Sequence, residues 1–378
     1  MTQYLPLDGV NWAASLTGER TEVYGVDVLN ADETPALDPT GAPLVLPYDA
    51  ADGGGIRAGL TGGKVTLNLD ARVQTGCTLN MIGASALIDW MSARLRPWVQ
   101  VNGMRWNLGI FLASSPDDVH DVDAVRQDVT LLDKTSILDA DELDTPLSLP
   151  VGEQVVPWVQ QIILDSSGES LTAIVPSDKT LSAALTWPAG TSKLDVVNQL
   201  LDSIAYNPLW CDREGQWRSE PWIDPADQAP SIVFAEGAAA IHSARIVVSQ
   251  NNTGVPNKVI CIVQGDDSNP GLIAVATNTD PTSPYSYARR GGRWIPKTYD
   301  NLEASDQATL ERIAARNLKL NSTPPWYASV QHAVVPLDGR QVLQLTSGDI
   351  DRQVTVNEYE ITMTPGELMT GKWKAVAA

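Results

Sequence analysis

The acidic stretch around His120 contains the residue types that could bind a metal ion. Four carboxylates surround this histidine: Asp117, Asp118, Asp121 and Asp123. Oxygen ligands of this kind suit hard divalent cations, but the stretch lacks the alternating Asp/Asn positions, the central glycine and the final glutamate of a calcium-binding loop. We therefore interpret it as a solvated loop that joins Leu112 to a strand over 125–132, and we predict no metal site.

Histidine is the usual general base at neutral pH, and this chain has only three, His120, His242 and His332. None of them lies in a motif such as H-E-x-x-H, and the chain has no G-x-S-x-G elbow and no G-x-G-x-x-G after a strand. With 46 Asp and Glu residues, a glycosidase-like carboxylate pair can always be found, so acidity alone indicates no hydrolase. We expect no catalytic residue, no cofactor and no enzyme.

Two segments could in principle hold phosphate. Gly63-Lys64 ends a glycine-rich stretch, but Val65 stands where a phosphate-binding loop needs Ser or Thr, and we interpret these glycines as marking turns. The run RRGGR at 289–293, followed by Trp294, is the one basic cluster. Against the net charge of the chain, we interpret it as a loop that pairs with acidic faces of a neighbouring copy.

Composition excludes several classes of protein. The 378 residues include 26 Lys and Arg against 46 Asp and Glu, so the formal charge is −20 and the pI is near 4.4. Such a surface repels phosphate backbones and argues against a protein that grips nucleic acid. No apolar run is long enough for a membrane span, and no secretory signal opens the chain. Three scattered cysteines, Cys77, Cys211 and Cys261, indicate buried thiols rather than disulfides or zinc ligands.

A β-hairpin is the clearest local prediction. Asn102-Gly103 separates apolar-rich runs at 94–101 and 104–113, and this dipeptide favours a turn in which both residues take positive φ. Trp98 and Trp106 flank the turn at equal distances. We interpret these two side chains as part of a core or an interface, and keep a sugar-stacking platform as the alternative.

Sheet and helix patterns divide the chain into four parts. Residues 1–63 form an extended, loop-rich segment with strand-like pieces at 21–29 and 44–47, and residues 64–144 alternate like sheet, at 64–69 and 78–82 for example. Residues 145–228 contain two amphipathic helices, over 154–164 and 195–204, and a second hairpin over 209–220, which indicates a small α+β domain. Residues 229–378 return to sheet, with strands at 245–249, 257–263, 273–277, 342–346 and 353–363 and one inserted helix at 305–320.

Four segments then follow one another in a distinctive order: residues 88–112, which contain IDW and NGMRWNLGIFL; VTLLDKT at 129–135; the hairpin over 209–215; and NTDPTSP at 278–284 before the helix at 305–320. This order resembles the tail hub proteins of long-tailed bacteriophages, the baseplate hub-like minor tail proteins. The resemblance covers most of the chain after residue 60. No motif in the first 60 residues contributes to it.

The resemblance implies a mainly β, multi-domain fold, with tail-tube-like β-barrel domains at 64–144 and 229–378 and the small α+β domain between them. It implies a structural virion protein, made in the host cytoplasm and placed at the distal end of the tail. There it would form a homotrimeric hub that adapts a sixfold tube to a threefold tip and lines the channel for genome ejection. The implied partners are the distal tail protein, the tape measure protein and other minor tail proteins, while viral DNA passes without specific binding.

Two other functions remain open from the sequence. The first is a carbohydrate- or receptor-binding module of the same tail tip, which would use the hairpin tryptophans as sugar platforms. The second is a tail-associated cell-wall hydrolase. Exposure of Trp98 and Trp106 separates the first alternative from a hub, because a binding platform must leave its rings in solvent.

Overall fold

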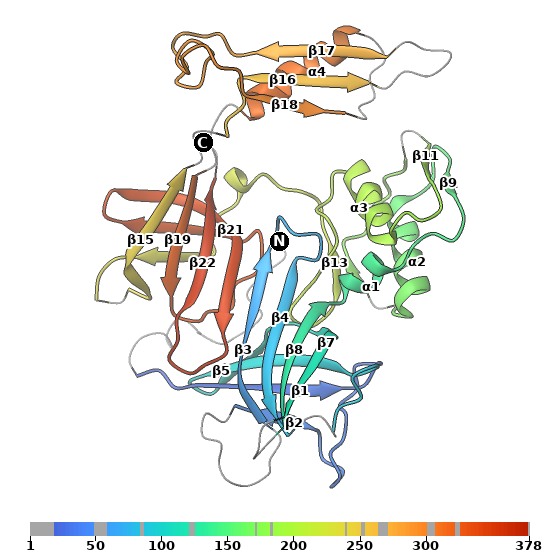
Figure 1. The fold of residues 1–378 in the computed structure, drawn as a ribbon, viewed down its shortest axis with the longest axis vertical. Helices are drawn as coiled ribbons and strands as arrows, with labels where there is room; N and C mark the ends of the chain where they lie inside the picture. Colours follow the sequence, from blue (N-terminus) through green and yellow to red (C-terminus); the bar gives the residue numbers. More distant parts are fainter. Residues whose placement is uncertain are drawn as a thin grey trace. The chain divides into compact units, whose positions relative to one another are not determined.

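The computed structural model describes residues 19–48, 59–83, 87–120, 125–170, 172–181, 184–238, 240–250, 254–263, 271–300, 307–321 and 326–376. The chain divides into two compact units. The first unit combines Met1–Ile246 with Val330–Ala378, and the second is the intervening Val247–Ser329. Both units are built mainly from β-strands (Figure 1), which confirms the mainly β fold class.

The largest sheet has 14 strands and belongs to the first unit, except for the parts of β15 and β19 that continue into residues 247–329. Its path runs through β15 (His242–Gln250), β19 (Trp326–His332), β22 (Met369–Ala375), β21 (Ile350–Thr362), β3 (Gly59–Asn68), β4 (Thr75–Ile82), β8 (Val125–Asp133), β7 (Phe111–His120), β5 (Arg94–Val101), β1 (Glu22–Leu29) and β2 (Val45–Pro47). Three strands branch from this path: β6 (Met104–Asn107) pairs with β5, β20 (Val342–Ser347) pairs with β21, and β14 (Ile232–Ala235) pairs with β20. Strands from both ends of the chain therefore share one sheet.

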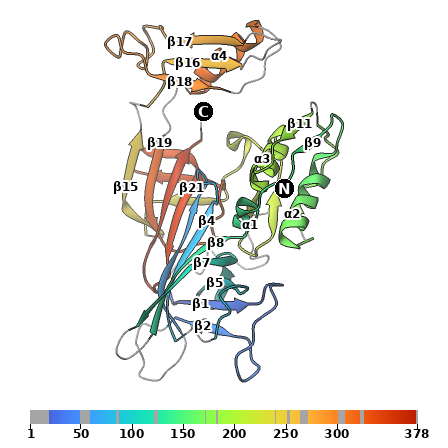
Figure 2. The ribbon, with the colours of Figure 1, turned by 45° about the vertical axis from the view of Figure 1, so that its right-hand side comes forward.

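The pairing of β21 with β3 makes this sheet continuous (Figure 2). The two strands are antiparallel, from Glu358 opposite Asn68 to Thr362 opposite Lys64. The two separate barrels implied by the resemblance would not share such a ladder. Among the described strands the ladders leave β15 and β2 at two open ends, and a single bridge from Tyr48 to Leu60 links the end of β2 to β3. One continuous sheet thus takes the place of two closed barrels.

The predicted hairpin between β5 and β6 is confirmed. Asn102 and Gly103 have φ values of 48° and 85°, as a turn with two left-handed residues requires. Trp98 and Trp106 are only 7% and 6% exposed, which confirms the core interpretation and contradicts a sugar-stacking platform. Trp98 lies opposite Gly25 on β1, where a Cβ atom would stand 2.4 Å from its ring.

Two predictions of loop or turn are wrong. Gly62 and Gly63 lie inside β3, at a bulge that shifts its register with β4, rather than in a turn. The segment that starts at Pro116 is strand rather than solvated loop, because β7 stays paired with β8 as far as His120 opposite Val125. No alternation of buried and exposed positions marks this hairpin end, because every side chain from Pro116 to His120 is exposed.

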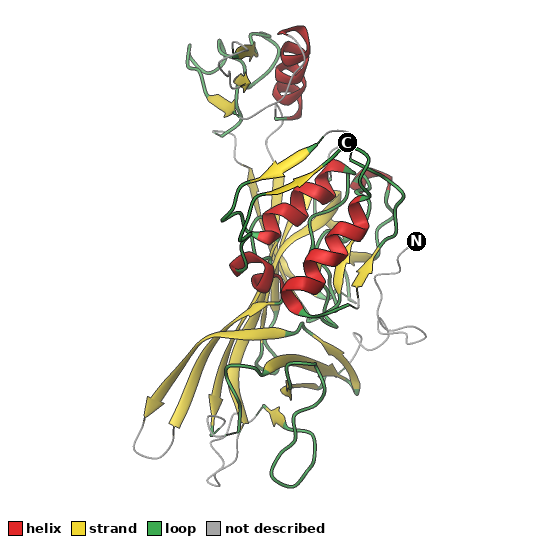
Figure 3. Ribbon diagram, turned by 90° about the vertical axis from the view of Figure 1, so that its right-hand side faces the viewer, coloured by secondary structure: helices red, strands yellow, loops and turns green. Residues whose placement is uncertain are grey.

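The α+β insertion contains both predicted helices, α2 (Val155–Ser167) and α3 (Lys193–Ser203), which contact each other (Figure 3). Ser192 caps α3 by accepting a hydrogen bond from the Leu194 amide. The apolar stripes of the two helices are buried in one core. The remaining elements are α1 (Thr135–Ala140), a 3₁₀ turn (Pro225–Asp227), the pair β9 (Leu147–Leu149) and β11 (Leu185–Trp187), and the sheet β10 (Thr172–Ile174), β13 (Trp217–Ser219) and β12 (Trp210–Cys211).

The second unit is a three-stranded sheet with one helix. Its strand order is β17 (Leu272–Thr277), β16 (Lys258–Val263) and β18 (Pro296–Tyr299), and α4 (Gln307–Leu320) packs on the sheet. The core contains Val259, Cys261, Ala274, Leu310 and Ala314. The helix predicted over 305–320 is confirmed from Gln307 onward, and its first two predicted residues, 305 and 306, lie outside the described residues.

Candidate functional site

The corner between β8 and α1 begins the attachment of the α+β insertion to the main sheet. Asp133 ends β8 and is nearly fully buried. Its carboxylate accepts hydrogen bonds from the backbone amides of Thr135, at 2.8 Å, and Thr75, at 3.2 Å. Burial raises the pKa of Asp133, while these hydrogen bonds lower it. The segment VTLLDKT therefore forms a bonded corner where the chain leaves the sheet.

Lys134 anchors this corner through ion pairs. Its side chain is only 2% exposed, and its Nζ lies 2.6 Å from Glu33 Oε1 and also pairs with Glu169. Arg94 on β5 pairs with the same Glu169 carboxylate at 3.2 Å. We call these four residues, Glu33, Arg94, Lys134 and Glu169, the charge cluster. It joins the N-terminal segment, the sheet and the insertion.

Trp217 on β13 extends the charge cluster into the core of the insertion. Its indole Nε1 donates a 2.7 Å hydrogen bond to Glu169, and Lys134 Nζ lies 5.5 Å from its ring centroid. Glu169 is thus held by two cations and one indole. Pairing a buried cation costs desolvation energy, and removing Lys134 would leave Glu33 with Arg94, 4.0 Å away, and Glu169 with Arg94 and Trp217.

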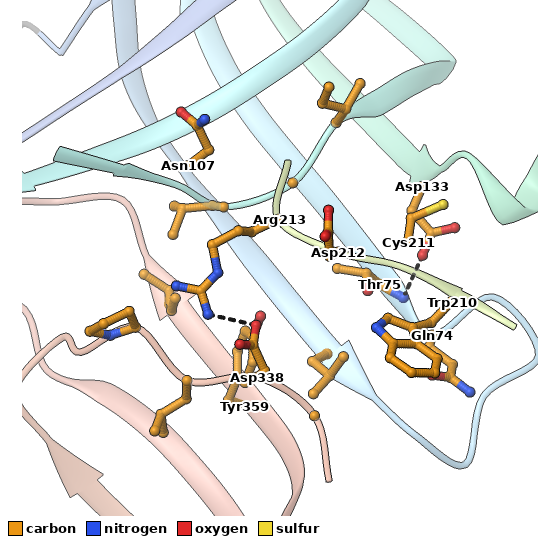
Figure 4. A pocket seen from close by; sticks show the side chains of 18 of the residues that line it. Gln74, Thr75, Asn107, Asp133, Trp210, Cys211, Asp212, Arg213, Asp338 and Tyr359 are labelled. Carbon is orange, nitrogen blue, oxygen red and sulfur yellow. Dashed lines mark hydrogen bonds and ion pairs between the residues drawn. The ribbon is translucent and has the colours of Figure 1, made fainter. Parts of the chain in front are cut away.

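A second junction lies around a small cavity of about 50 Å³ (Figure 4). Arg213, in the turn between β12 and β13, pairs with Asp338 at 2.6 Å. Its side chain is 9% exposed. Burial, and then the neighbouring Asp338 carboxylate, raise the pKa of Tyr359 on β21 to about 12. This ion pair connects the insertion to the strands from the C-terminal part of the sheet.

Two packing contacts reinforce the second junction. The Arg340 guanidinium lies 5.1 Å from the Trp210 ring, a cation–π arrangement, and burial lowers the pKa of Arg340 to about 10. Gly215 has a φ of 76° and leaves so little room that a Cβ there would stand 2.6 Å from the Ile110 side chain. The hairpin of the insertion therefore fits closely against the segment after β6.

An open cleft of about 520 Å³ lies beside β1 and β5. Within it, Asp27 is clamped by Arg96, at 2.8 Å, and by Arg105, and it also accepts a 3.1 Å hydrogen bond from Trp98. The Arg105 guanidinium lies 4.3 Å from the Trp98 ring. The Asp27 carboxylate thus pairs with the guanidinium groups of both Arg96 and Arg105. We therefore interpret these three residues as a structural cluster that holds β1, β5 and β6 together, and not as an anion-binding site.

The three histidines lie apart from these junctions. His120 is exposed at the end of β7, whereas His242 and His332 are buried beside Phe234 and Trp373. Burial lowers the pKa of His332 to about 4, so its imidazole is neutral at pH 7. Neither buried ring lies beside a nucleophile in the described structure.

The acidic stretch does not assemble into a metal site in the part that the structure describes. Asp117 and Asp118 are exposed on β7, while Asp121 and Asp123 lie outside the described residues. No group of three His, Cys, Asp or Glu side chains that could hold a metal occurs among the described residues. Cys77 and Cys261 are buried and Cys211 is half-buried, and all three are free thiols.

The basic run 289–293 lies in an ordered loop of the second unit. The side chain of the fully buried Asn257 donates to the Arg293 carbonyl at 2.9 Å and accepts from the Ile295 amide at 2.7 Å. Tyr287 and Trp294 stack with ring centroids 4.3 Å apart. Gly291 and Gly292 take the positive φ values that the turn requires.

Comparisons show which proteins share this architecture. No protein-family model matches the chain, and no curated protein matches its sequence. Its fold matches those of the tail protein from Neisseria meningitidis MC58 (TM-score 0.64, 9% identity, 94% of this chain and 96% of that chain) and the 43 kDa tail protein of prophage MuSo2 from Shewanella oneidensis (0.60, 11%, 94% and 98%). It also matches prophage tail protein gp18 from Listeria monocytogenes EGD-e (0.51, 11%, 92% and 94%).

The chain therefore has the fold of phage tail proteins, which confirms the resemblance drawn from the sequence. None of the helices in the described part of the chain has the length and apolarity needed to cross a bilayer.

Sequence reasoning missed the partners that make the junctions. It singled out the segment around Lys134 and the hairpin around Arg213, but it assigned no role to Glu33, Glu169 or Asp338. These carboxylates lie 101, 35 and 125 residues away along the chain from the cations that they pair with. No local pattern marks such pairs.

Proposed function

We propose that this chain is a structural, non-catalytic protein of a phage virion that forms a trimeric hub at the distal end of the tail. In this role it adapts a sixfold tail tube to a threefold tip and lines the channel through which the genome passes. The observation that carries the proposal is the likeness to phage tail proteins across more than nine-tenths of the chain.

The two junctions suit a structural protein, because they hold the α+β insertion firmly against the main sheet. The charge cluster and the pair of Arg213 with Asp338 attach one insertion to the sheet at two separate places. Two attachment points restrain rotation as well as separation. The remaining features, exposed acidic strands and a formal charge of −20, suit a channel that repels the DNA backbone and lets it slide.

The proposal includes the division of the sheet. We assign residues 64–144 and 229–378 to the two tube-like halves that each subunit contributes, and residues 145–228 to the domain between them. Closed symmetry then requires heterologous contacts between subunits, and the open sheet ends at β15 and β2 are edges that a neighbour can cover. The proposed partners are further copies, the distal tail protein, the tape measure protein and other minor tail proteins.

Two measurements test this function. Light scattering of the purified chain should give about 122 kDa, three times the 40.7 kDa subunit. Gold-labelled antibodies against the chain should mark the distal end of intact virion tails. A monomer at every concentration would contradict the trimer, and label along the tail shaft or on the capsid would contradict the position at the tip.

A further inference from the structure

The second unit has one sheet face that the described helix does not cover. α4 packs against the face that carries Val259, Cys261 and Ala274, and Figure 3 shows the helix on one side of this sheet. Side chains alternate across a strand, so their neighbours point the other way. The opposite face, which we call the open face, carries Lys258, Ile260 and Ile262 on β16, Ile273 and Val275 on β17, and Thr298 on β18.

The open face is apolar at its centre. Ile260 pairs with Val275 and Ile262 pairs with Ile273 across the two strands. Ile273 and Val275 are 60% and 51% exposed within the chain, although β-branched aliphatic side chains are among the residues most often buried. A contiguous apolar surface on a sheet marks an interaction site more often than isolated apolar residues do.

A cation and an aromatic ring border this surface. Lys258 Nζ lies 5.9 Å from the ring centroid of Trp294, whose side chain is 37% exposed. Trp294 follows the basic run 289–293, in which Arg289 and Arg293 are exposed. An apolar centre with aromatic and cationic neighbours has the composition of a protein interface, in which aromatic residues and arginine are enriched.

Charge indicates which partner fits this face. Residues 247–329 contain eight Lys and Arg against seven Asp and Glu, a formal charge of +1, whereas the rest of the chain carries −21. The unit is therefore nearly neutral and has a basic loop, while the first unit of every copy is strongly acidic. The complementarity is therefore local, and Lys258 and the basic run 289–293 favour contact with the acidic first unit of another copy.

We propose that the open face docks on the acidic first unit of a second copy of this chain. The inference rests on the self-association in the proposed function, and it assigns to the second unit one of the contacts that close the ring. Burial of Ile273 and Val275 supplies the apolar part of the contact, and Lys258 supplies a cation at its edge.

Cysteine labelling of the full chain tests the proposal. Val275→Cys places a thiol on the open face, and Val233→Cys on β14 is the matched control, because Val233 is 60% exposed in the first unit. Maleimide labelling rates are measured from nanomolar to high micromolar protein, with the wild-type rate subtracted, and light scattering gives the mass at each concentration. Circular dichroism checks that both variants fold.

The expected result is labelling at position 275 that slows about tenfold as the protein assembles, while labelling at position 233 stays constant. Slow labelling of position 275 at all concentrations would show that its own chain covers the face, and would overturn the proposal. Rapid labelling in an assembled trimer would also overturn it but would leave the trimer standing. A monomer at all concentrations would remove the proposed trimer and, with it, the docking contact.

A charge reversal tests the electrostatic part. The comparison uses a protein concentration at which assembly slows labelling of the Val275→Cys variant. At that concentration, adding Lys258→Glu to this variant should raise the labelling rate several-fold. Lys297→Glu is the control, because Lys297 pairs with Val259 and lies on the side of the sheet that faces α4. Equal labelling rates in the two charge variants would contradict a role for Lys258 in docking.

Discussion

The two units of this protein differ in how much of their sheets is covered by other segments of the chain. In the first unit, the buried cations Lys134 and Arg213 pair with carboxylates from segments distant in sequence and so close two junctions. In the second unit, one helix covers one face of a three-stranded sheet, and the face with Ile273 and Val275 stays exposed. The difference is that buried cations tie distant segments together at the junctions of the first unit, whereas one sheet face of the second unit has no covering element among the described residues.

The strongest test of this difference is removal of the cation at the centre of the charge cluster. Lys134→Met should lower the free energy of unfolding of the first unit by about 3 kcal/mol, because the partly buried carboxylates of Glu33 and Glu169 lose the buried ammonium group that they share. Urea denaturation measures the loss. The control is Lys64→Met, which breaks a pair with Glu360 that is nearly half exposed and should cost less than about 1 kcal/mol. Equal losses would contradict a special role for the cluster.

Acid should also act on the first unit through a buried histidine, whereas residues 247–329 contain no histidine. His332 has a folded pKa of about 4, lowered by burial and then by the nearby charges of His242 and Arg20, against 6.5 in the unfolded chain. Between these values the unfolded state binds the extra proton, so this residue makes stability fall by up to about 3 kcal/mol as the pH drops from 6.5 to 4.

Urea denaturation of wild type and His332→Phe at several pH values measures this effect. The variant should show a smaller loss of stability over the same pH range, whatever its stability at pH 7. Parallel curves for the two proteins would show that His332 does not titrate as its burial predicts.

Close packing inside the first unit gives the next largest effect. Gly25→Ala should cost about 2 kcal/mol, because the new methyl group would overlap the Trp98 ring and displace it from its hydrogen bond to Asp27. Gly76→Ala on β4 is the control, since its Cβ would stand 3.5 Å from the nearest atom. Thermal unfolding compares the two, and a Gly25 variant as stable as the control would contradict the tight fit.

The smallest effect compares the two faces of the second unit. Val259→Thr places a hydroxyl in the core under α4 and should cost about 1.5 kcal/mol, whereas Val275→Thr on the open face should change stability by less than about 0.5 kcal/mol. Hydrogen exchange of the amides in β16 and β17 measures both. Similar losses at dilute, unassembled concentrations would show that the open face is covered within the same chain.

Local sequence patterns predicted the elements that local energetics decide. The Asn102-Gly103 turn needs only two residues that accept positive φ, and α2 and α3 follow from apolar stripes at helical spacing. The end of β7 was not predicted, because this strand is held by its pairing with β8 and its sequence shows no alternation of apolar and polar residues. The bulge at Gly62 and Gly63 was missed because it is defined by the pairing of β3 with β4. In the sequence alone, two adjacent glycines were interpreted as a turn.

By itself, the sequence determined the charge of −20, the mainly β composition, the two helices of the insertion and the resemblance to phage tail proteins. Only the tertiary structure decided that β21 joins β3 in one sheet, that Lys134 meets Glu33 and Glu169, and that one face of the second unit stays open. The physical reason is the distance along the chain over which each interaction acts. Turns, caps and amphipathic stripes act within a few residues, whereas ladders between distant strands and ion pairs across the fold depend on which surfaces meet.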